Sequence, residues 1–184
     1  MSICVFPGTF NPIHDGHIKM AEFAINNFGF SKIIFIPSYI PPHKDLESNL
    51  AEHRYKMVEL AIKDNPKFEV SDIEYKNEAK SYSLITVKKI IEQYDIKNRL
   101  NFIIGTDAFA KIDSWYRAEE LKNLVHFIVF KRKGVGVENK DGWDYELAEM
   151  DYVNVSSTDI RAKKSLKLNK NVEGYIKENG LYKV

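Results

Sequence analysis

Residues 6–17 read Phe-Pro-Gly-Thr-Phe-Asn-Pro-Ile-His-Asp-Gly-His and overlap the end of a short apolar run, Ile3–Phe6. This run predicts a buried strand, because it is short, apolar and closed at once by Pro-Gly. Beyond the quoted stretch, apolar residues recur at helical spacing, at Ile18, Ala21, Ile25 and Phe28. Gly29 then marks the end of that helix. The stretch therefore predicts a strand, a turn and a helix in succession.

The same alternation of short apolar runs and longer helical patterns continues along the chain. Further strands are predicted at Ile33–Ile36, Phe68–Ile73, Phe102–Ile104, Val125–Phe130 and Tyr152–Val155. Further helices are predicted at about Leu50–Lys63, around Leu84–Tyr94, from Ser156 onward and at Val172–Lys177. Apolar strands that alternate with helices favour a mostly parallel sheet covered on both faces. The predicted fold is therefore α/β, Rossmann-like and doubly wound, and such sheets bind ligands at the carboxyl ends of their strands.

Composition narrows the class of protein. The length of 184 residues fits a single domain, with a small C-terminal helical part from about residue 157. Lys and Arg total 27 against 26 Asp and Glu, and this balance excludes binding of nucleic acid through bulk positive charge. The single cysteine, Cys4, excludes an internal disulfide and a cysteine zinc cluster. No uncharged apolar run approaches ~18 residues and the N-terminus lacks a basic leader, so a cytoplasmic location without membrane contact is expected.

The turn after the first strand carries the residue types of an anion site. Gly8 lets the backbone approach a ligand closely, and Thr9 offers a hydroxyl. His14 and His17 are three residues apart at the start of a helix, where free N–H groups and the helix dipole favour phosphate. Two other interpretations are a surface histidine pair and a metal site with His43 as third ligand. The metal site is disfavoured because no acidic or cysteine partner has suitable spacing.

A second element with similar chemistry lies near the C-terminal end. Ser156-Ser157-Thr158-Asp159-Ile160-Arg161 follows a predicted strand and opens a helix. Ser157 or Thr158 can cap that helix, and Arg161 can reach a phosphate with two donors. Taken alone, the segment also fits an ordinary helix cap followed by a solvated arginine. Two such elements in one α/β chain together favour a site for phosphate oxygens.

These two segments resemble the signatures of one superfamily of nucleotide-binding enzymes. His14-Asp15-Gly16-His17 matches the H-x-G-H signature of nucleotidyltransferases, and residues 156–161 match their S-[ST]-T-x-[IV]-R element. Three further segments resemble the bacterial nicotinate mononucleotide adenylyltransferase family over nearly the whole chain. They are Pro37–Lys44 (P-x-x-x-P-P-H-K), Ser81–Ser83 (S-Y-[ST]) and Gly105–Asp107 (G-x-D), followed by the aromatic pair Trp115-Tyr116.

The resemblance implies roles for individual residues. For ATP binding it implies Gly8, Thr9, Phe10, His14, His17, Gly105, Asp107, Arg132, Ser157, Thr158 and Arg161. For the acceptor nucleotide it implies Asn11, His43, Lys44, Ser83, Trp115 and Tyr116. The residues implied in stabilising the reacting phosphates are His14, His17, Lys44 and Arg161. This chain has Ser83 where the family often has threonine, which keeps the hydroxyl and loses a methyl group.

The implied reaction needs no covalent nucleophile from the protein. The 5′-phosphate of nicotinate mononucleotide attacks the α-phosphorus of ATP in line, and pyrophosphate leaves. The attacking phosphate is already anionic, so positioning and charge stabilisation are the tasks left to the protein. Mg²⁺ is expected to be held by the ATP phosphates and water, because the sequence shows no acidic cluster for it. Cys4 is expected in the core.

Several alternatives stay open at this point. The acceptor could instead be nicotinamide mononucleotide, phosphopantetheine or a cytidylyl acceptor, although the Pro-Pro-His-Lys loop and Trp115-Tyr116 speak against the last two. A non-catalytic nucleotide sensor on the same fold is a different class of function, disfavoured because both histidines and Arg161 are present. The expected partners are the small-molecule substrates, without nucleic acid or membrane. For a homo-oligomer, the sequence offers Tyr175 and Tyr182 as exposed aromatic candidates.

Overall fold

The computed structural model describes residues 2–40, 50–77, 80, 82–131, 136–151, 156–163 and 167–182. Within these ranges six strands form one sheet, in the order β3-β2-β1-β4-β5-β6. The strands are β1 (Ile3–Gly8), β2 (Lys32–Pro37), β3 (Phe68–Val70), β4 (Leu100–Gly105), β5 (Val125–Phe130) and β6 (Tyr145–Ala148). Every neighbouring pair among them is parallel. The predicted doubly wound, Rossmann-like α/β fold is thus confirmed.

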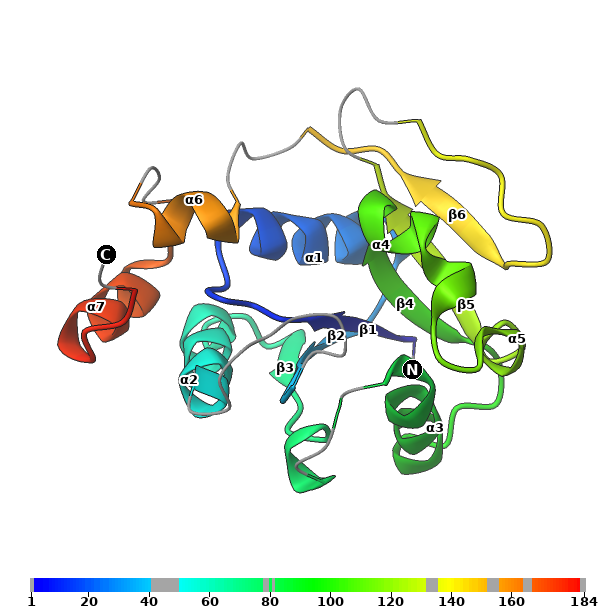
Figure 1. Cartoon of the computed structure of the whole chain (residues 1–184), viewed down its shortest axis with the longest axis horizontal. Helices are drawn as coiled ribbons and strands as arrows, with labels where there is room; N and C mark the ends of the chain where they lie inside the picture. Colours follow the sequence, from blue (N-terminus) through cyan, green and yellow to red (C-terminus); the bar gives the residue numbers. More distant parts are fainter. Residues whose placement is uncertain are drawn as a thin grey trace.

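Helices cover both faces of this sheet, and Figure 1 shows it between α1 on one side and α3 on the other. The helices are α1 (Asp15–Phe28), α2 (Ala51–Ile62), α3 (Ser83–Gln93), α4 (Thr106–Ala110), α5 (Ala118–Leu121), α6 (Ser157–Arg161) and α7 (Lys170–Glu178). Two short 3₁₀ turns, η2 (Tyr75–Asn77) and η3 (Ile112–Ser114), lie between them. Buried residues of α1, α2 and α7 share one core cluster, and those of α3, α4 and α5 share the other.

The two clusters arise from the alternation of side chains along the strands. In β1, Ile3 and Val5 belong to the cluster under α3, whereas Cys4 and Phe6 belong to the cluster under α1. All four are buried, with Cys4 completely so. Successive side chains of a strand point to opposite faces, so a strand covered on both faces must be apolar at every position. This explains the unbroken apolar runs, and it confirms the prediction that Cys4 is a core residue.

One predicted strand differs from the observed one in length, and another lies outside the described residues. The strand expected at Tyr152–Val155 lies outside the described residues, and the sixth strand is β6, which the sequence did not reveal. Only Ala148 of β6 is buried, and Leu147 is exposed, as is ordinary for a short edge strand with little apolar signal. β3 ends at Val70 rather than at Ile73, because the Ser71 hydroxyl accepts the N–H of Ile73 and turns the chain.

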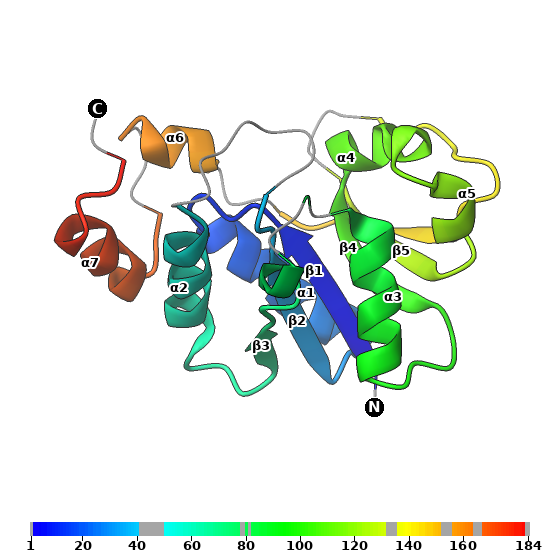
Figure 2. The same cartoon turned by 60° about the horizontal axis from the view of Figure 1, so that its bottom comes forward.

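The C-terminal part packs onto the body of the protein. In Figures 1 and 2, α7 lies beside α2. Tyr175 on α7 pairs its hydroxyl with Nδ1 of His53 on α2 at 2.8 Å. The Tyr182 hydroxyl donates to Oδ1 of Asn11 at 2.5 Å. The prediction that these two tyrosines are exposed is therefore wrong, because both are half-buried in contacts within the chain, and a subunit contact through them stays a prediction. A separate part beginning near residue 157 stays a prediction.

Among the described helices, none combines the length and the apolar character needed to cross a membrane.

Gly29 ends α1, as the sequence pattern predicted, and it does so in the left-handed conformation. Its φ is 70°, and its N–H donates to the carbonyl of Ile25 at 3.1 Å. Glycine adopts this conformation without a steric penalty, whereas a Cβ in it approaches the following carbonyl. The end of the helix is thus set by one residue that allows a positive φ.

Gly29→Ala should lower the free energy of unfolding by about 1 kcal/mol, because a left-handed φ strains any side chain even where space is open. Gly174→Ala is the matched control, since Gly174 lies inside α7 with no atom within 4 Å of an added Cβ. That change should raise the stability by about 0.5 kcal/mol or more. Urea denaturation of both variants measures the two effects. Equal effects of the two changes would contradict this account of Gly29.

Candidate active site

The candidate site lies where the strand order of the sheet reverses. β1 lies between β2 and β4 in the sheet. β3 follows β2 on one side, and β5 and β6 follow β4 on the other. β1 and β4 pair at Cys4–Asn101 and Val5–Phe102, and the two strands end at Gly8 and Gly105. In Figure 2 the strands run upward from the N-terminus, and α4 and α6 lie at the upper edge where they end. Doubly wound sheets bind ligands at this crevice, and both predicted glycines lie there.

The turn after β1 is held by the ring of Phe10. A Cβ added to Gly8 would meet Cζ of that ring at 2.9 Å, so the position accepts only glycine without a shift. Phe10 has a φ of 49° and is 3% exposed. Its ring packs edge-on against those of Phe6 and His17, at 5.4 and 5.0 Å between centroids. Phe10 was predicted in the ATP site, and its buried side chain leaves only the backbone for such a contact.

The two signature histidines lie one above the other at the start of α1. Their rings stack with centroids 3.7 Å apart and planes 24° apart. The backbone N–H of His14 donates to Nδ1 of His17 at 3.1 Å. Because Nδ1 of His17 accepts this bond, a neutral His17 ring carries its proton on Nε2 as a donor. The predicted pairing of the two side chains is confirmed.

His14 is held in its neutral form. Burial lowers the pKa of His14 to about 4, because the charged ring would lose its solvation. Nδ1 of the ring is buried and has no hydrogen-bond partner among the described atoms. A second charge stacked on the first at this distance would also be unfavourable. At neutral pH the site therefore presents uncharged imidazole at the positive end of a helix.

Arg161 ties α6 to the turn after β1. One of its terminal nitrogens donates to the carbonyl of Asn11 at 2.6 Å, and the other donates to the Thr158 hydroxyl at 3.3 Å. The Ser157 hydroxyl donates to the carbonyl of Pro12 at 2.9 Å. These contacts bring both signature segments together, as the sequence predicted. A guanidinium has five N–H donors, so these two bonds leave capacity for a phosphate oxygen.

The sequence predicted the wrong residue as the N-cap of α6. Ser156, rather than Ser157 or Thr158, accepts the N–H of Asp159 at 3.0 Å. The sequence Ser-Ser-Thr fits a cap at any of the three positions, and the choice is made by the contact of Ser157 with Pro12. The hydroxyls of Ser157 and Thr158 therefore face the turn and Arg161 instead of the helix N-terminus.

Gly105 and Asp107 lie beside the turn, at the end of β4. Gly105 precedes α4, and no atom lies within 4 Å of a Cβ added there. Asp107 is exposed in the first turn of α4. Between them, Thr106 is buried, and its hydroxyl has no partner among the described atoms. Open space at a strand end beside an exposed carboxylate suits the ribose hydroxyls expected here.

The predicted acceptor residues come from two segments that meet. Ser83 opens α3, and the Tyr82 ring before it lies 4.7 Å from the Tyr116 ring. Tyr116 is 47% exposed, whereas Trp115 packs against the core beside Phe102. Tyr116 thus offers the more accessible face for stacking. The predicted residues His43, Lys44 and Arg132 lie outside the described residues.

Two residues at the site gave no motif signal. Tyr182 reaches Asn11 from the C-terminal end, and Arg54 on α2 donates to the carbonyls of Thr9 and Tyr39. Arg54 could have been noticed, because it occupies the apolar face of α2 together with Ala51 and Val58. An arginine on an apolar helix face predicts that buried hydrogen-bond acceptors lie nearby. Tyr182 carried no comparable signal.

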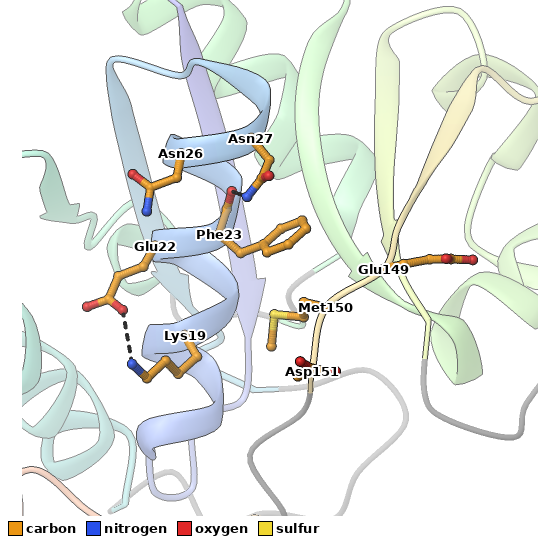
Figure 3. A pocket seen from close by; sticks show the side chains of 8 residues that line it. All are labelled: Lys19, Glu22, Phe23, Asn26, Asn27, Glu149, Met150 and Asp151. Atoms are coloured by element: carbon orange, nitrogen blue, oxygen red, sulfur yellow. Dashed lines mark hydrogen bonds and ion pairs between the residues drawn. The ribbon is translucent and has the colours of Figure 1, made fainter.

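A separate hollow of about 560 Å³ lies along α1, as Figure 3 shows. It is lined by Lys19, Glu22, Phe23, Asn26, Asn27, Glu149, Met150 and Asp151. The residues come from α1 and from the segment that follows β6, and Lys19 pairs with Glu22 at 3.8 Å. No predicted site residue belongs to this lining. We therefore place the site at the strand ends, where the signature residues contact one another.

Comparisons with known proteins show the family of the chain. Residues 5–163 match the cytidylyltransferase-like family. The chain is 37% identical to a probable nicotinate-nucleotide adenylyltransferase of Caldicellulosiruptor saccharolyticus, with all of both chains covered. It is 39% identical to the nicotinate-nucleotide adenylyltransferase of Bacillus subtilis, covering 98% of this chain and 97% of that one.

Solved structures show the same fold. The nicotinic acid mononucleotide adenylyltransferase of Plasmodium falciparum, complexed with NaAD, superposes with a TM-score of 0.78 at 20% identity. That match covers 98% of this chain and 97% of the other. A putative nicotinate-nucleotide adenylyltransferase from Vibrio parahaemolyticus superposes with a TM-score of 0.69 at 25% identity, over 99% of this chain and 96% of that one.

The pKa of His14 predicts a loss of stability in mild acid. The unfolded chain takes up the proton below about pH 6.5, whereas the folded chain resists it down to about 4. The free energy of unfolding should therefore fall as the pH drops through this interval, by on the order of 2–3 kcal/mol. His14→Gln should remove that part of the pH dependence, as measured by urea denaturation. A His14 ring that titrates near 6.5 by NMR would contradict the assignment.

Proposed function

The chain belongs to the cytidylyltransferase-like family and, within it, to the nicotinate-nucleotide adenylyltransferases, and we propose that it transfers the adenylyl group of ATP to nicotinate mononucleotide. The products are nicotinate adenine dinucleotide and pyrophosphate, a step of NAD biosynthesis. The observation that carries the proposal is the stacked His14–His17 pair at the α1 N-terminus, joined to Arg161 through the turn between them. This arrangement would suit the binding of a triphosphate.

In the proposed reaction an oxygen of the acceptor 5′-phosphate forms a bond to the α-phosphorus. The bond from that phosphorus to the bridging oxygen breaks, and pyrophosphate leaves with the electron pair. Since the acceptor phosphate is anionic at neutral pH, it needs no general base. The neutral His14, with its low pKa, fits a role in hydrogen bonding rather than in proton abstraction.

The residues of the turn would stabilise the charge that develops on the phosphoryl oxygens. His17 offers its Nε2–H, because its Nδ1 is engaged by the backbone of His14. Arg161 offers its remaining donors, and the N-terminus of α1 adds its dipole. Lys44 is proposed as a further cation from the segment after β2. Such preorganised donors act on the transition state at little cost of rearrangement.

For the acceptor we propose that Tyr116 stacks on the nicotinate ring, with Tyr82 supporting it. Ser83 would contact the ring substituent, and backbone N–H groups would bind its carboxylate. Asn11 and His43 would approach the acceptor phosphate. Gly105 and Asp107 would hold adenosine, the carboxylate accepting from the ribose hydroxyls. Aromatic stacking gives affinity for either pyridine ring, so selection between them falls to the groups around the carboxylate.

Mg²⁺ is proposed to arrive with ATP. Among the described residues, no group of three histidine, cysteine, aspartate or glutamate side chains could hold a metal ion. A cation coordinated by phosphate oxygens and water fits this chemistry, since Mg²⁺ keeps much of its hydration. When bound, it would neutralise charge on the phosphates. A cytoplasmic location and a homo-oligomer stay predictions.

Pyrophosphate release identifies the acceptor. The protein is given ATP and Mg²⁺ with nicotinate mononucleotide, nicotinamide mononucleotide or phosphopantetheine in separate reactions. We expect strong preference for the nicotinate form. Comparable rates with the nicotinamide form would retain the phosphate chemistry and reject a pocket selective for carboxylate. Binding of ATP with no release from any acceptor would instead favour a nucleotide sensor.

His17→Asn tests the donor at Nε2 without removing the acceptor at the start of α1. The asparagine oxygen can still accept the His14 N–H, while the distal donor is lost. Turnover should fall on the order of 10²-fold, as for loss of one donor to a transition-state oxygen, with little change in thermal stability. His126→Asn, at the opposite end of the sheet in β5, serves as the control and should keep normal turnover. Near-normal turnover of His17→Asn would reject the assigned role.

A further inference from the structure

Arg54 is a completely buried cation beneath the candidate site. Its exposed fraction is 0%, and it lies on the face of α2 that also buries Met57 and Val58. Arginine almost never occupies such a position unless it is paired. A leucine or methionine would fill the same place without the cost of removing a charge from water. The contacts of the guanidinium should therefore explain its presence.

Those contacts join the ends of two neighbouring strands. One terminal nitrogen donates to the carbonyl of Thr9, just after β1, at 2.8 Å. The other donates to the carbonyl of Tyr39, just after β2, at 2.9 Å. Because the guanidinium is planar and rigid, two short bonds from its two ends fix the separation of these carbonyls. Nε has no hydrogen-bond partner among the described atoms, so the guanidinium bonds to the backbone through its two terminal nitrogens.

The two joined segments have different tasks in the proposed reaction. Thr9 belongs to the turn that leads to His14 and His17. Tyr39 precedes by a few residues the segment that carries His43 and Lys44. One side chain thus links the turn proposed for ATP to the end of β2, from which the sequence continues to His43 and Lys44. It does so from below the strand ends, without itself belonging to either motif.

The bonds also set the direction of the peptide groups. In a trans peptide the carbonyl and the next N–H point in opposite directions. With the Thr9 carbonyl turned toward Arg54, the N–H of Phe10 points away from α2. With the Tyr39 carbonyl turned the same way, the N–H of Ile40 also points away from it. Arg54 therefore orients donors on the far side of both segments.

We infer that Arg54 is a positioning residue, which sets the distance between the turn after β1 and the end of β2 and so aligns the groups that these two strand ends present to the reacting phosphates. This inference rests on the proposed function. Its effect should appear in the catalytic step, because a displacement of about 1 Å between reacting groups can cost on the order of 10²-fold in rate. Adenosine is proposed to be held by Gly105 and Asp107, and the pyridine ring by Ser83 and Tyr116, all outside these two strand ends, so binding of each nucleotide alone should change little.

The competing explanation is that the charge of Arg54 simply attracts the triphosphate. Burial lowers the pKa of the guanidinium, and nearby acidic groups (Tyr75, Tyr182 and Glu74) oppose the effect. The side chain stays charged at neutral pH, since an arginine pKa lies far above it. A lysine at this position keeps the charge but has one nitrogen, which cannot hold two carbonyls in a fixed geometry. The two explanations therefore differ in what Arg54→Lys should do.

The experiment compares Arg54→Lys, Arg54→Met and the control Lys56→Met. Lys56 lies on the exposed side of the same helix, paired with Glu59, so its loss removes one positive charge from α2 away from the site. For each protein, kcat and both KM values are measured with ATP and nicotinate mononucleotide. Calorimetry measures binding of each nucleotide alone, and thermal unfolding reports the folded state.

We expect Arg54→Lys to lower kcat on the order of 10- to 100-fold, with each KM within about threefold of normal. Arg54→Met should lower kcat at least as far, and Lys56→Met should be normal. Normal kcat in Arg54→Lys, or raised KM values with unchanged kcat, would overturn the inference in favour of charge alone. Loss of the folded state in both Arg54 variants would overturn it in favour of a purely structural role. Failure of the proposed function is separate, because the unmodified protein would then release no pyrophosphate with this acceptor.

Discussion

The carbonyl groups of the turn after β1 impose the constraint on which the site depends. β1 is one of the two central strands of the described sheet, and the turn that leaves it is almost entirely buried, so each of its polar backbone groups needs a partner. The carbonyls of Thr9, Asn11 and Pro12 find theirs in Arg54, Arg161 and Ser157. These three side chains come from α2 and α6, on opposite sides of the turn. The backbone requirement of one short segment therefore draws both helices to the end of the sheet.

The proposed anion site has no surplus of positive charge. The chain has a net charge of only +1, and the guanidinium groups of Arg54 and Arg161 donate hydrogen bonds to the turn itself. His14 is kept neutral by burial, with its pKa lowered to about 4. Attraction for phosphate then comes from oriented N–H groups, a helix N-terminus and the unused donors of Arg161. Approach of phosphate would raise the pKa of His14, because a nearby negative charge favours the protonated ring.

The sequence predicted the parts of the molecule that depend on local pattern. Strands that are buried on both faces appear in the sequence as apolar runs, and Gly29 ends α1 at the position that the apolar spacing predicted. The signature histidines and Arg161 came together as expected. Features that depend on a distant partner were missed or misassigned. β6 is an edge strand with one buried residue, and the choice of Ser156 as cap depends on where Ser157 meets Pro12, 145 residues away in the chain.

The bond between Tyr182 and Asn11 has a consequence for how the protein is made. It spans 171 residues, so the turn after β1 gains this partner only after the segments between them have been synthesised. β1 likewise leaves the ribosome well before β4, which begins at residue 100 and pairs with it on one side. The centre of the sheet must therefore wait for later segments, and contacts of such long sequence separation slow folding. Until then the nascent chain carries both signature histidines without the arginine that completes the site.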